Sequence, residues 1–275
     1  LVFIVLPLLI LLVVVAFGGV ALHQAEMRDM LINHNRQAVS AAADTLSRQL
    51  DQRQLVLTAL ANQTASRDLE DVIDSAAWLS ALFDGGVAIY AEDGHLLAAT
   101  SSQTDWQALA EPIAHVIPPT PLPLVTPGEN ATRVVLVAAT ASRQAVRTVG
   151  VVSLDSLTSA DVLEGSHEVG SIHVYLLGPD GAILYHSDAT QVGAYFKDVA
   201  SRVVNMTTAE AFERKDAKGH DVIATSAPVR AAEGWTLVQE ERWKETLSPL
   251  MRYSQAAPLA LVPGLLIAVG AVWLG

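Results

Sequence analysis

The chain has 275 residues, of which 51% are hydrophobic and 17% charged, with a formal net charge of −12 and no cysteine. The acidic balance gives no electrostatic attraction for nucleic acid or anionic lipid, and the lack of cysteine excludes disulfides, thiolate catalysis and cysteine-type zinc sites. The apolar fraction is too high for an ordinary soluble domain unless it is concentrated in a few segments.

The apolar excess lies at the two ends. Residues 1–22 and 256–275 contain no charged residue, and each segment has about the 20 residues that a helix needs to cross a bilayer. A cleaved signal peptide is the alternative for the first segment, but its apolar core is normally shorter and ends at a small-residue cleavage site. We predict two transmembrane helices, with the long region between them outside the cytoplasm, in a fragment of a longer protein.

Residues 23–65 follow the first predicted span. No Gly or Pro occurs from His23 to Gln63, and the apolar residues recur at spacings of three, four or seven, which is typical of one helix face. We predict a long stalk helix continuous with the span, although the same stripe also suits an ordinary core helix. The stripe consists of Met27, Leu31, Ala38, Ala42, Leu46, Leu50, Leu57 and Leu60.

An internal repeat begins beyond a second predicted helix, which starts near Ser66 as its N-cap. Residues 87–100, VAIYAEDGHLLAAT, align with residues 174–187, VYLLGPDGAILYHS, and each is a strand, an Asp-Gly turn and a second strand. Further strand pairs follow each hairpin in the same order, at an offset of roughly 85 residues. These pairs are predicted at 133–140 with 146–154, and at 221–230 with 235–241.

The repeat predicts two copies of one α+β module. We place the membrane-distal module at 66–165, the membrane-proximal module at 166–241, and a juxtamembrane helix at 242–255 before the second span. A Pro-rich stretch at 118–127 is predicted to be an extended surface loop.

This order of parts resembles the double Cache family of bacterial sensor domains. Residues 174–193, VYLLGPDGAILYHSDATQVG, are similar to the signature of that family's proximal module, and residues 227–241, APVRAAEGWTLVQEE, to its closing hairpin. The resemblance implies a long helix carrying two tandem PAS-like antiparallel sheets. It also implies a homodimeric receptor, a small molecule in the distal module, and an output beyond the second span: a histidine kinase, a chemoreceptor rod or a cyclic-dinucleotide enzyme.

Candidate ligand-binding residues are polar and aromatic side chains of each module, because a pocket needs an apolar lining with a few converging polar groups. Alternation along a strand predicts that Tyr185 and His186 face opposite sides and cannot share one pocket. The Arg and Trp that hold amino acids in many family members are not found in their usual context, and Trp106 and Arg133 are the nearest equivalents. The candidates are Tyr90, His95, Trp106 and Arg133 in the distal module, and Tyr175, Tyr185, His186 and Asp188 in the proximal one.

Motifs for catalysis, cofactors or metals do not stand out. The sequence contains no His-Glu-x-x-His, Gly-x-Ser-x-Gly or P-loop string. We predict a binding module without catalytic residues, metal or cofactor, in a two-pass protein of the inner membrane with no nucleic-acid partner. A membrane-anchored extracytoplasmic enzyme and an assembly protein without a cytoplasmic effector are the alternatives.

Overall fold

A computed structural model gives the fold, and for several residues before Gln24 and for Ala77 it describes the backbone alone. The described residues are 2–64, 66–101, 104–116, 120–124, 132–139, 146–158, 172–196, 199, 202–203, 206–216, 219–242 and 270.

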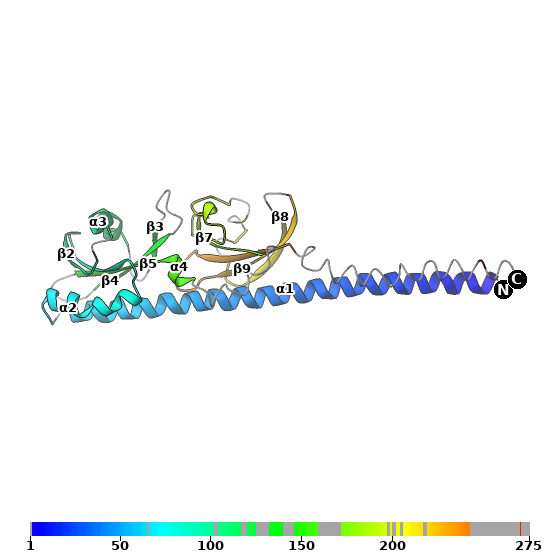
Figure 1. Ribbon diagram of the computed structural model, residues 1–275, viewed down its shortest axis with the longest axis horizontal. Helices are drawn as coiled ribbons and strands as arrows, with labels where there is room; N and C mark the ends of the chain where they lie inside the picture. Colours follow the sequence, from blue (N-terminus) through cyan, green and yellow to red (C-terminus); the bar gives the residue numbers. More distant parts are fainter. Residues whose placement is uncertain are drawn as a thin grey trace.

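A single helix runs along the molecule. α1 (Val2–Gln63) has 62 residues, which gives a length of about 90 Å, and both sheets lie along its C-terminal half (Figure 1). The predicted stalk helix is therefore confirmed, and its backbone continues without a break through residues 2–22. In the described part of the chain, no helix combines the length and the apolar character needed to cross a membrane. The predicted spans at 1–22 and 256–275 lie largely outside the described residues and side chains, and they stay predictions.

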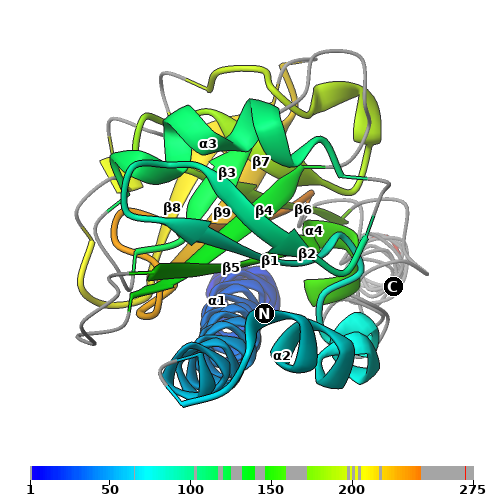
Figure 2. The ribbon, with the colours of Figure 1, turned by 90° about the vertical axis from the view of Figure 1, so that its left-hand side faces the viewer.

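The first sheet has five antiparallel strands in the order β2-β1-β5-β4-β3. α1 and α2 (Leu69–Ser75) lie on one face of this sheet, and α3 (Trp106–Ala114) covers the other (Figure 2). A short 3-10 helix, η1 (Ala77–Ala81), leads from α2 into the sheet. The strands are β1 (Gly86–Ala91), β2 (Leu96–Ala99), β3 (Leu122–Leu124), β4 (Arg133–Ala139) and β5 (Val146–Ser153).

The second sheet repeats the first. Its order, β7-β6-β10-β9-β8, is the order of the first sheet with each strand replaced by its equivalent. Gly94 and Gly181 both have φ 84° in the two Asp-Gly turns, a conformation that side chains disfavour, so the predicted repeat is confirmed. The strands are β6 (Ile172–Leu177), β7 (Ile183–His186), β8 (Glu210–Lys215), β9 (Asp221–Pro228) and β10 (Thr236–Glu241).

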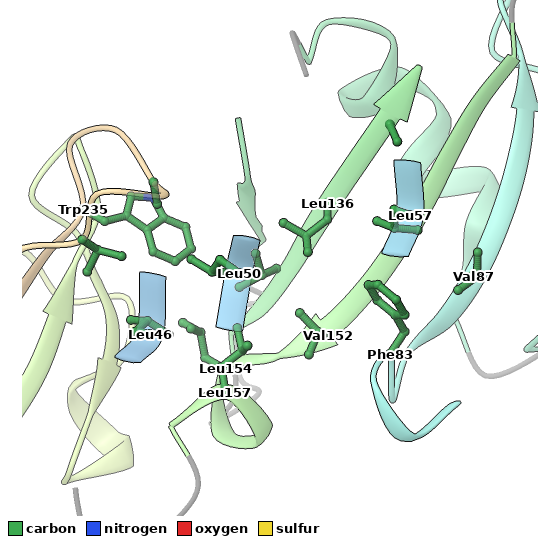
Figure 3. Close-up of a cluster of buried hydrophobic side chains, with 14 of the residues drawn as sticks. Leu46, Leu50, Leu57, Phe83, Val87, Leu136, Val152, Leu154, Leu157 and Trp235 are labelled. Carbon is green, nitrogen blue, oxygen red and sulfur yellow. The ribbon is translucent and has the colours of Figure 1, made fainter. Parts of the chain in front are cut away.

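One apolar cluster joins α1 to both sheets (Figure 3). Leu57 of α1 packs under the distal sheet, where Gly150 of β5 leaves the space that the Phe83 ring fills. Nearer the middle of the molecule, α4 (Leu154–Leu157) brings two leucines to the same cluster as Trp235, which is 2% exposed and directly precedes β10. The inner faces of the two sheets therefore share one core with the helix.

Three details differ from the sequence predictions. α2 begins at Leu69 rather than near Ser66, because the Ser66 hydroxyl donates to the Gln63 carbonyl and closes the end of α1 instead. The Pro-rich stretch contributes β3, in which Pro123 pairs with Val134 at the sheet edge, where a strand tolerates the missing N–H. The helix α3 and the strand β8 were not predicted.

Other predicted segments cannot be compared with the structure. The junction of the two predicted modules at 165–166 and the juxtamembrane helix at 242–255, apart from Arg242, lie outside the described residues. The module boundaries at 65, 165 and 241 therefore stay predictions.

Candidate functional site

Each sheet has one face against α1 and one face away from it. Successive residues of a strand point to opposite faces, so in β5 Gly150 and Val152 face the helix whereas Val149 and Val151 face outward. We call the outward surfaces the distal outer face and the proximal outer face. The distal outer face comprises Ala88, Tyr90, Val135, Val137, Arg147, Val149 and Val151 with α3 above them; the proximal outer face comprises His173, Tyr175, His186, Arg214, Val238 and Glu240 with Phe196 above them.

Two predicted residues, Tyr90 and Trp106, meet on the distal outer face. The Tyr90 hydroxyl donates to the Trp106 carbonyl at 2.6 Å, and the Trp106 indole N–H donates to the Ser101 carbonyl at 2.7 Å. Burial, and secondarily the charge of Asp105, raises the pKa of Tyr90 to about 12. The pair forms an aromatic wall whose hydrogen-bond donors are already used by the backbone.

A cation that the sequence reasoning missed lies beside this wall. Arg147 of β5 is the partner of Tyr90 in the antiparallel register, so both side chains occupy one face. Its Nη1 donates to the carbonyls of Ile113 and Val116 at 2.6 and 3.1 Å. Arg147 therefore anchors the C-terminal end of α3 to the sheet, where the helix carbonyls favour a positive charge.

The remaining two distal candidates lie apart from the Tyr90–Trp106 pair. His95 is exposed in the β1–β2 turn, where its backbone N–H donates to Asp93. Arg133 opens β4, six residues before the Ala139 that pairs with Arg147, a separation of about 20 Å along a strand. The two arginines therefore stand at opposite ends of the distal outer face.

The proximal outer face holds a buried charged network. The hydroxyl of Tyr175 donates to Glu240 Oε1 at 2.5 Å, and Arg214 Nη1 donates to the same oxygen at 2.6 Å. The side chains of Arg214 and Glu240 are 18% and 9% exposed, and the Arg214 guanidinium lies over the Phe196 ring. Burial first, and then the Glu240 charge, raises the pKa of Tyr175 well above its ordinary value.

Two predicted residues, His186 and Tyr175, stack here with a histidine that was not predicted. The His186 ring lies 5.5 Å from that of Tyr175 and 6.1 Å from that of His173. Burial, followed by the His173 charge, lowers the pKa of His186. Its Nδ1 accepts a hydrogen bond from the backbone N–H of Asp188 at 2.8 Å.

Asp188 and Tyr185 do not join this stack. The Asp188 carboxylate is exposed and accepts from the hydroxyl and backbone N–H of Thr190, and these bonds lower its pKa. Tyr185 packs against the inner cluster, where burial raises its pKa. The predicted separation of Tyr185 from His186 is therefore confirmed, since the two side chains lie on opposite faces.

Chemically, both outer faces combine aromatic rings with charged or titratable groups, which suits binding. Among the described residues, no group of three or more His, Cys, Asp or Glu side chains is arranged to hold a metal ion. The residues missed from the sequence, Arg147, His173, Arg214 and Glu240, lie on strands whose pairing decides which face they share. An alternation pattern extended across the paired strands is the signal that finds them.

No protein-family profile matches the sequence, and no curated protein matches it. Solved structures do match. They include the ligand-binding domain of the amino-acid chemoreceptor PctB of Pseudomonas aeruginosa with L-Arg (19% identity, 82% of this chain, 93% of that chain, TM-score 0.61). They also include the ligand-binding domain of chemoreceptor CtaA of Pseudomonas fluorescens with L-isoleucine (18% identity, 82% of this chain, 98% of that chain, TM-score 0.59). A third is the extracellular domain of a histidine kinase (14% identity, 80% of this chain, 95% of that chain, TM-score 0.58).

These matched structures are double Cache sensor domains, and their TM-scores of 0.58 to 0.61 show that this chain shares their fold. The resemblance predicted from the sequence is therefore confirmed for the fold.

Proposed function

We propose that the chain is the extracytoplasmic small-molecule-sensing region of a transmembrane receptor. The observation that carries the proposal is the fold, which matches ligand-binding domains over 93% to 98% of their own length in two chemoreceptors. The two outer faces, each with aromatic and charged groups on a rigid sheet, support it further.

The distal outer face is the proposed ligand site. Tyr90 and Trp106 supply an aromatic wall, and Arg147 supplies a positive charge beside it. Because Arg147 also holds α3, a ligand that contacts this arginine favours one position of α3 over another. A ligand can shift a conformational equilibrium only by its difference in affinity for the two states, typically worth about 1–3 kcal/mol.

The receptor context extends the proposal beyond the described residues. We propose that the protein is a homodimer of the inner membrane, held by the two predicted spans, with an output beyond residue 275. The matched proteins include chemoreceptors and a histidine kinase, and either type of output suits a long helix that continues into the predicted span.

Thermal unfolding of the 275-residue chain in detergent, against a panel of metabolites, tests the proposal. A ligand at about 100 times its dissociation constant stabilises the fold by about 2.7 kcal/mol. We expect at least one compound to raise the melting temperature and Arg147→Gln to reduce that rise. The matched control is Arg230→Gln, since Arg230 is 75% exposed in an ion pair with Asp44.

Two outcomes would count against the proposal. No rise with any compound of a broad panel would remove the support for direct sensing. Recovery of the bound compound in a chemically changed form would favour the enzyme alternative instead.

A further inference from the structure

Two histidines meet at the edge of the proximal sheet. His186 lies in the edge strand β7 and His173 in the adjacent β6, with their rings 6.1 Å apart. Both side chains are half-buried, so protons from solvent can reach the rings while their neighbours hold them in place. Histidine is the side chain whose charge ordinarily changes between about pH 5 and pH 8.

The hydrogen bond of His186 fixes where its second proton must go. Nδ1 accepts from the Asp188 N–H, so Nδ1 carries no proton and the neutral ring holds its proton on Nε2. Protonation therefore places a hydrogen on Nδ1, directly against a donor. The bond to Asp188 is lost. The Asp188 carboxylate is exposed and already accepts from Thr190, so its attraction to the new charge replaces only part of that bond.

That bond anchors the segment that covers the face. The chain from His186 passes through the 3-10 helix η2 (Ala189–Gln191) and returns to β7, where the Gly193 N–H donates to the Ile183 carbonyl at 2.9 Å. It ends at Phe196, whose ring lies 5.5 Å from that of Tyr175. This segment is here called the cover segment (residues 187–196). Its ends are also held by backbone bonds from Ser187 to Val174 and between Ile183 and Ala194, so losing the His186 bond loosens the turn between them.

The charged and titratable groups around His186 determine how readily its ring takes up a proton. Within the described residues, the titratable and charged groups that face His186 are His173 and Tyr175 on β6, Asp188 in the cover segment and, one strand further, Glu240 on β10 with Arg214 on β8. His173 is the register partner of Glu240. A positive charge on the His173 ring repels one on the His186 ring, so it makes protonation of His186 less favourable.

A route leads from the cover segment to the strand by which the chain leaves the module. Phe196 packs on Tyr175, and the Tyr175 hydroxyl is bonded to Glu240 of β10. The next residue, Glu241, accepts from the amide of Asn35 on α1 at 2.6 Å. His186 itself also stacks on Tyr175. A change at His186 therefore reaches β10, the exit strand, through two side-chain contacts, His186 with Tyr175 and Tyr175 with Glu240.

We propose that the proximal module is a proton-sensing site, in which acidification protonates His186, breaks the His186–Asp188 hydrogen bond and loosens the cover segment. This adds a second stimulus, the external pH, to the small molecule of the distal module. Its role as a stimulus rests on the proposed function, whereas the opening of the cover segment does not.

Hydrogen exchange of the 275-residue chain in detergent tests the opening without any ligand. After correction for the intrinsic pH dependence of exchange, protection of the cover segment should fall roughly tenfold between about pH 7.5 and pH 5.5. His186→Asn keeps an acceptor oxygen near the Nδ1 position and does not titrate, so its protection should stay constant. His95→Asn, at an exposed histidine of the equivalent distal hairpin, should respond as the wild type does.

Unchanged protection in the wild type overturns the proposal, and so does an equal loss in His186→Asn. If His186→Asn does not fold, NMR titration of the wild type replaces it: the His186 ring nitrogens and the Asp188 amide must shift at one pH, and independent titration overturns the proposal. A failed metabolite screen leaves these outcomes untouched, because no ligand is involved.

Discussion

At the level of single residues, the proximal outer face holds a carboxylate that is almost fully buried. Glu240 is stabilised there by a guanidinium and a phenol hydroxyl on one oxygen. Such a pair adds little net stability compared with apolar residues, but removing one partner leaves the other charge buried and uncompensated. The mutational cost at Glu240 should therefore exceed that at any exposed carboxylate of the same sheet.

Glu240→Gln should lower the free energy of unfolding by about 2 kcal/mol, because Arg214 then keeps its charge without a counter-ion. The matched control is Glu213→Gln on β8, whose partner is Arg28 of α1. That pair is 56% and 39% exposed, and an exposed ion pair contributes at most about 1 kcal/mol. Chemical denaturation of both variants measures the difference, and equal costs would contradict the buried network.

Tyr90 makes stability depend on pH in the alkaline range. Its pKa is about 12 in the folded protein, against 10.0 for a free phenol. Between these values the unfolded chain releases the proton and the folded chain keeps it, so stability falls as pH rises. Tyr90→Phe should cost about 1 kcal/mol at neutral pH through the lost hydrogen bond.

When the pH rises above 10, Tyr90→Phe should lose less additional stability than the wild type loses, because the variant has no phenol at this position to ionise. Denaturation at about pH 9 and pH 11 tests this. Tyr195→Phe, at a tyrosine that is 58% exposed, is the control and should follow the wild-type curve. A Tyr90→Phe curve parallel to the wild type would show that Tyr90 ionises normally.

Among the elements, α1 serves as the common support of both sheets. Its buried positions include Val39, Ala43, Leu46, Leu50 and Leu57, spaced so that one stripe of the helix meets the inner faces in turn. Gln54, beside this stripe, donates to the Val137 carbonyl of β4 at 2.8 Å. The helix is therefore tied to the distal sheet by packing and by a polar contact.

Neighbouring leucines of α1 should differ sharply on truncation. Leu57 is fully buried and Leu55 is 71% exposed. Leu57→Ala should cost about 3 kcal/mol, because a cavity opens next to Phe83, whereas Leu55→Ala should change stability by less than about 0.5 kcal/mol. Equal melting temperatures for the two variants would show that this helix does not carry the distal core.

Elements defined by local chemistry were predictable from the sequence. The Asp-Gly turns need a glycine with positive φ, so Gly94 and Gly181 mark both hairpins. The 3.6-residue spacing of leucines likewise marks α1. By contrast, β8 has four charged residues among its six, three of them consecutive from Glu213 to Lys215, and resembles a solvated loop until β9 pairs with it.

Candidate site residues were less predictable, because their neighbours are set by strand register. Tyr90 and Trp106 are 16 residues apart, with the strand β2 between them in the chain, and they meet where α3 begins above the sheet. Arg214 and Glu240 meet across two strand pairings that no local pattern specifies. The sequence therefore reveals aromatic candidates but not the charges that complete each face.

For the whole molecule, the single inner cluster has a consequence for cooperativity. α4 lies between the two sheets, and Leu154 and Leu157 belong to the same buried cluster as Leu50 of α1 and Trp235 of the proximal module. Neither sheet can lose its contact with α1 without exposing part of this cluster. The two modules should therefore unfold together in one transition.

Leu154→Ala tests this expectation, since the side chain is 1% exposed. It should cost about 3 kcal/mol and lower hydrogen-exchange protection equally in β1 and β9. Leu97→Ala, at a position that is 41% exposed in β2, should leave both strands protected. Loss of protection in one sheet alone, or two separate transitions, would mean that the modules fold independently.

The contact between Asn35 and Glu241 also restricts how the molecule can move. Glu241 is 2% exposed, and the residues one helical turn to either side of Asn35 are Leu31 and Val39. A slide of the exit strand along α1 by one turn, about 5.4 Å, would set a buried carboxylate against an apolar side chain at a cost of several kcal/mol. The contact therefore opposes sliding by a full turn, whereas a tilt or rotation of α1 and β10 together keeps it intact.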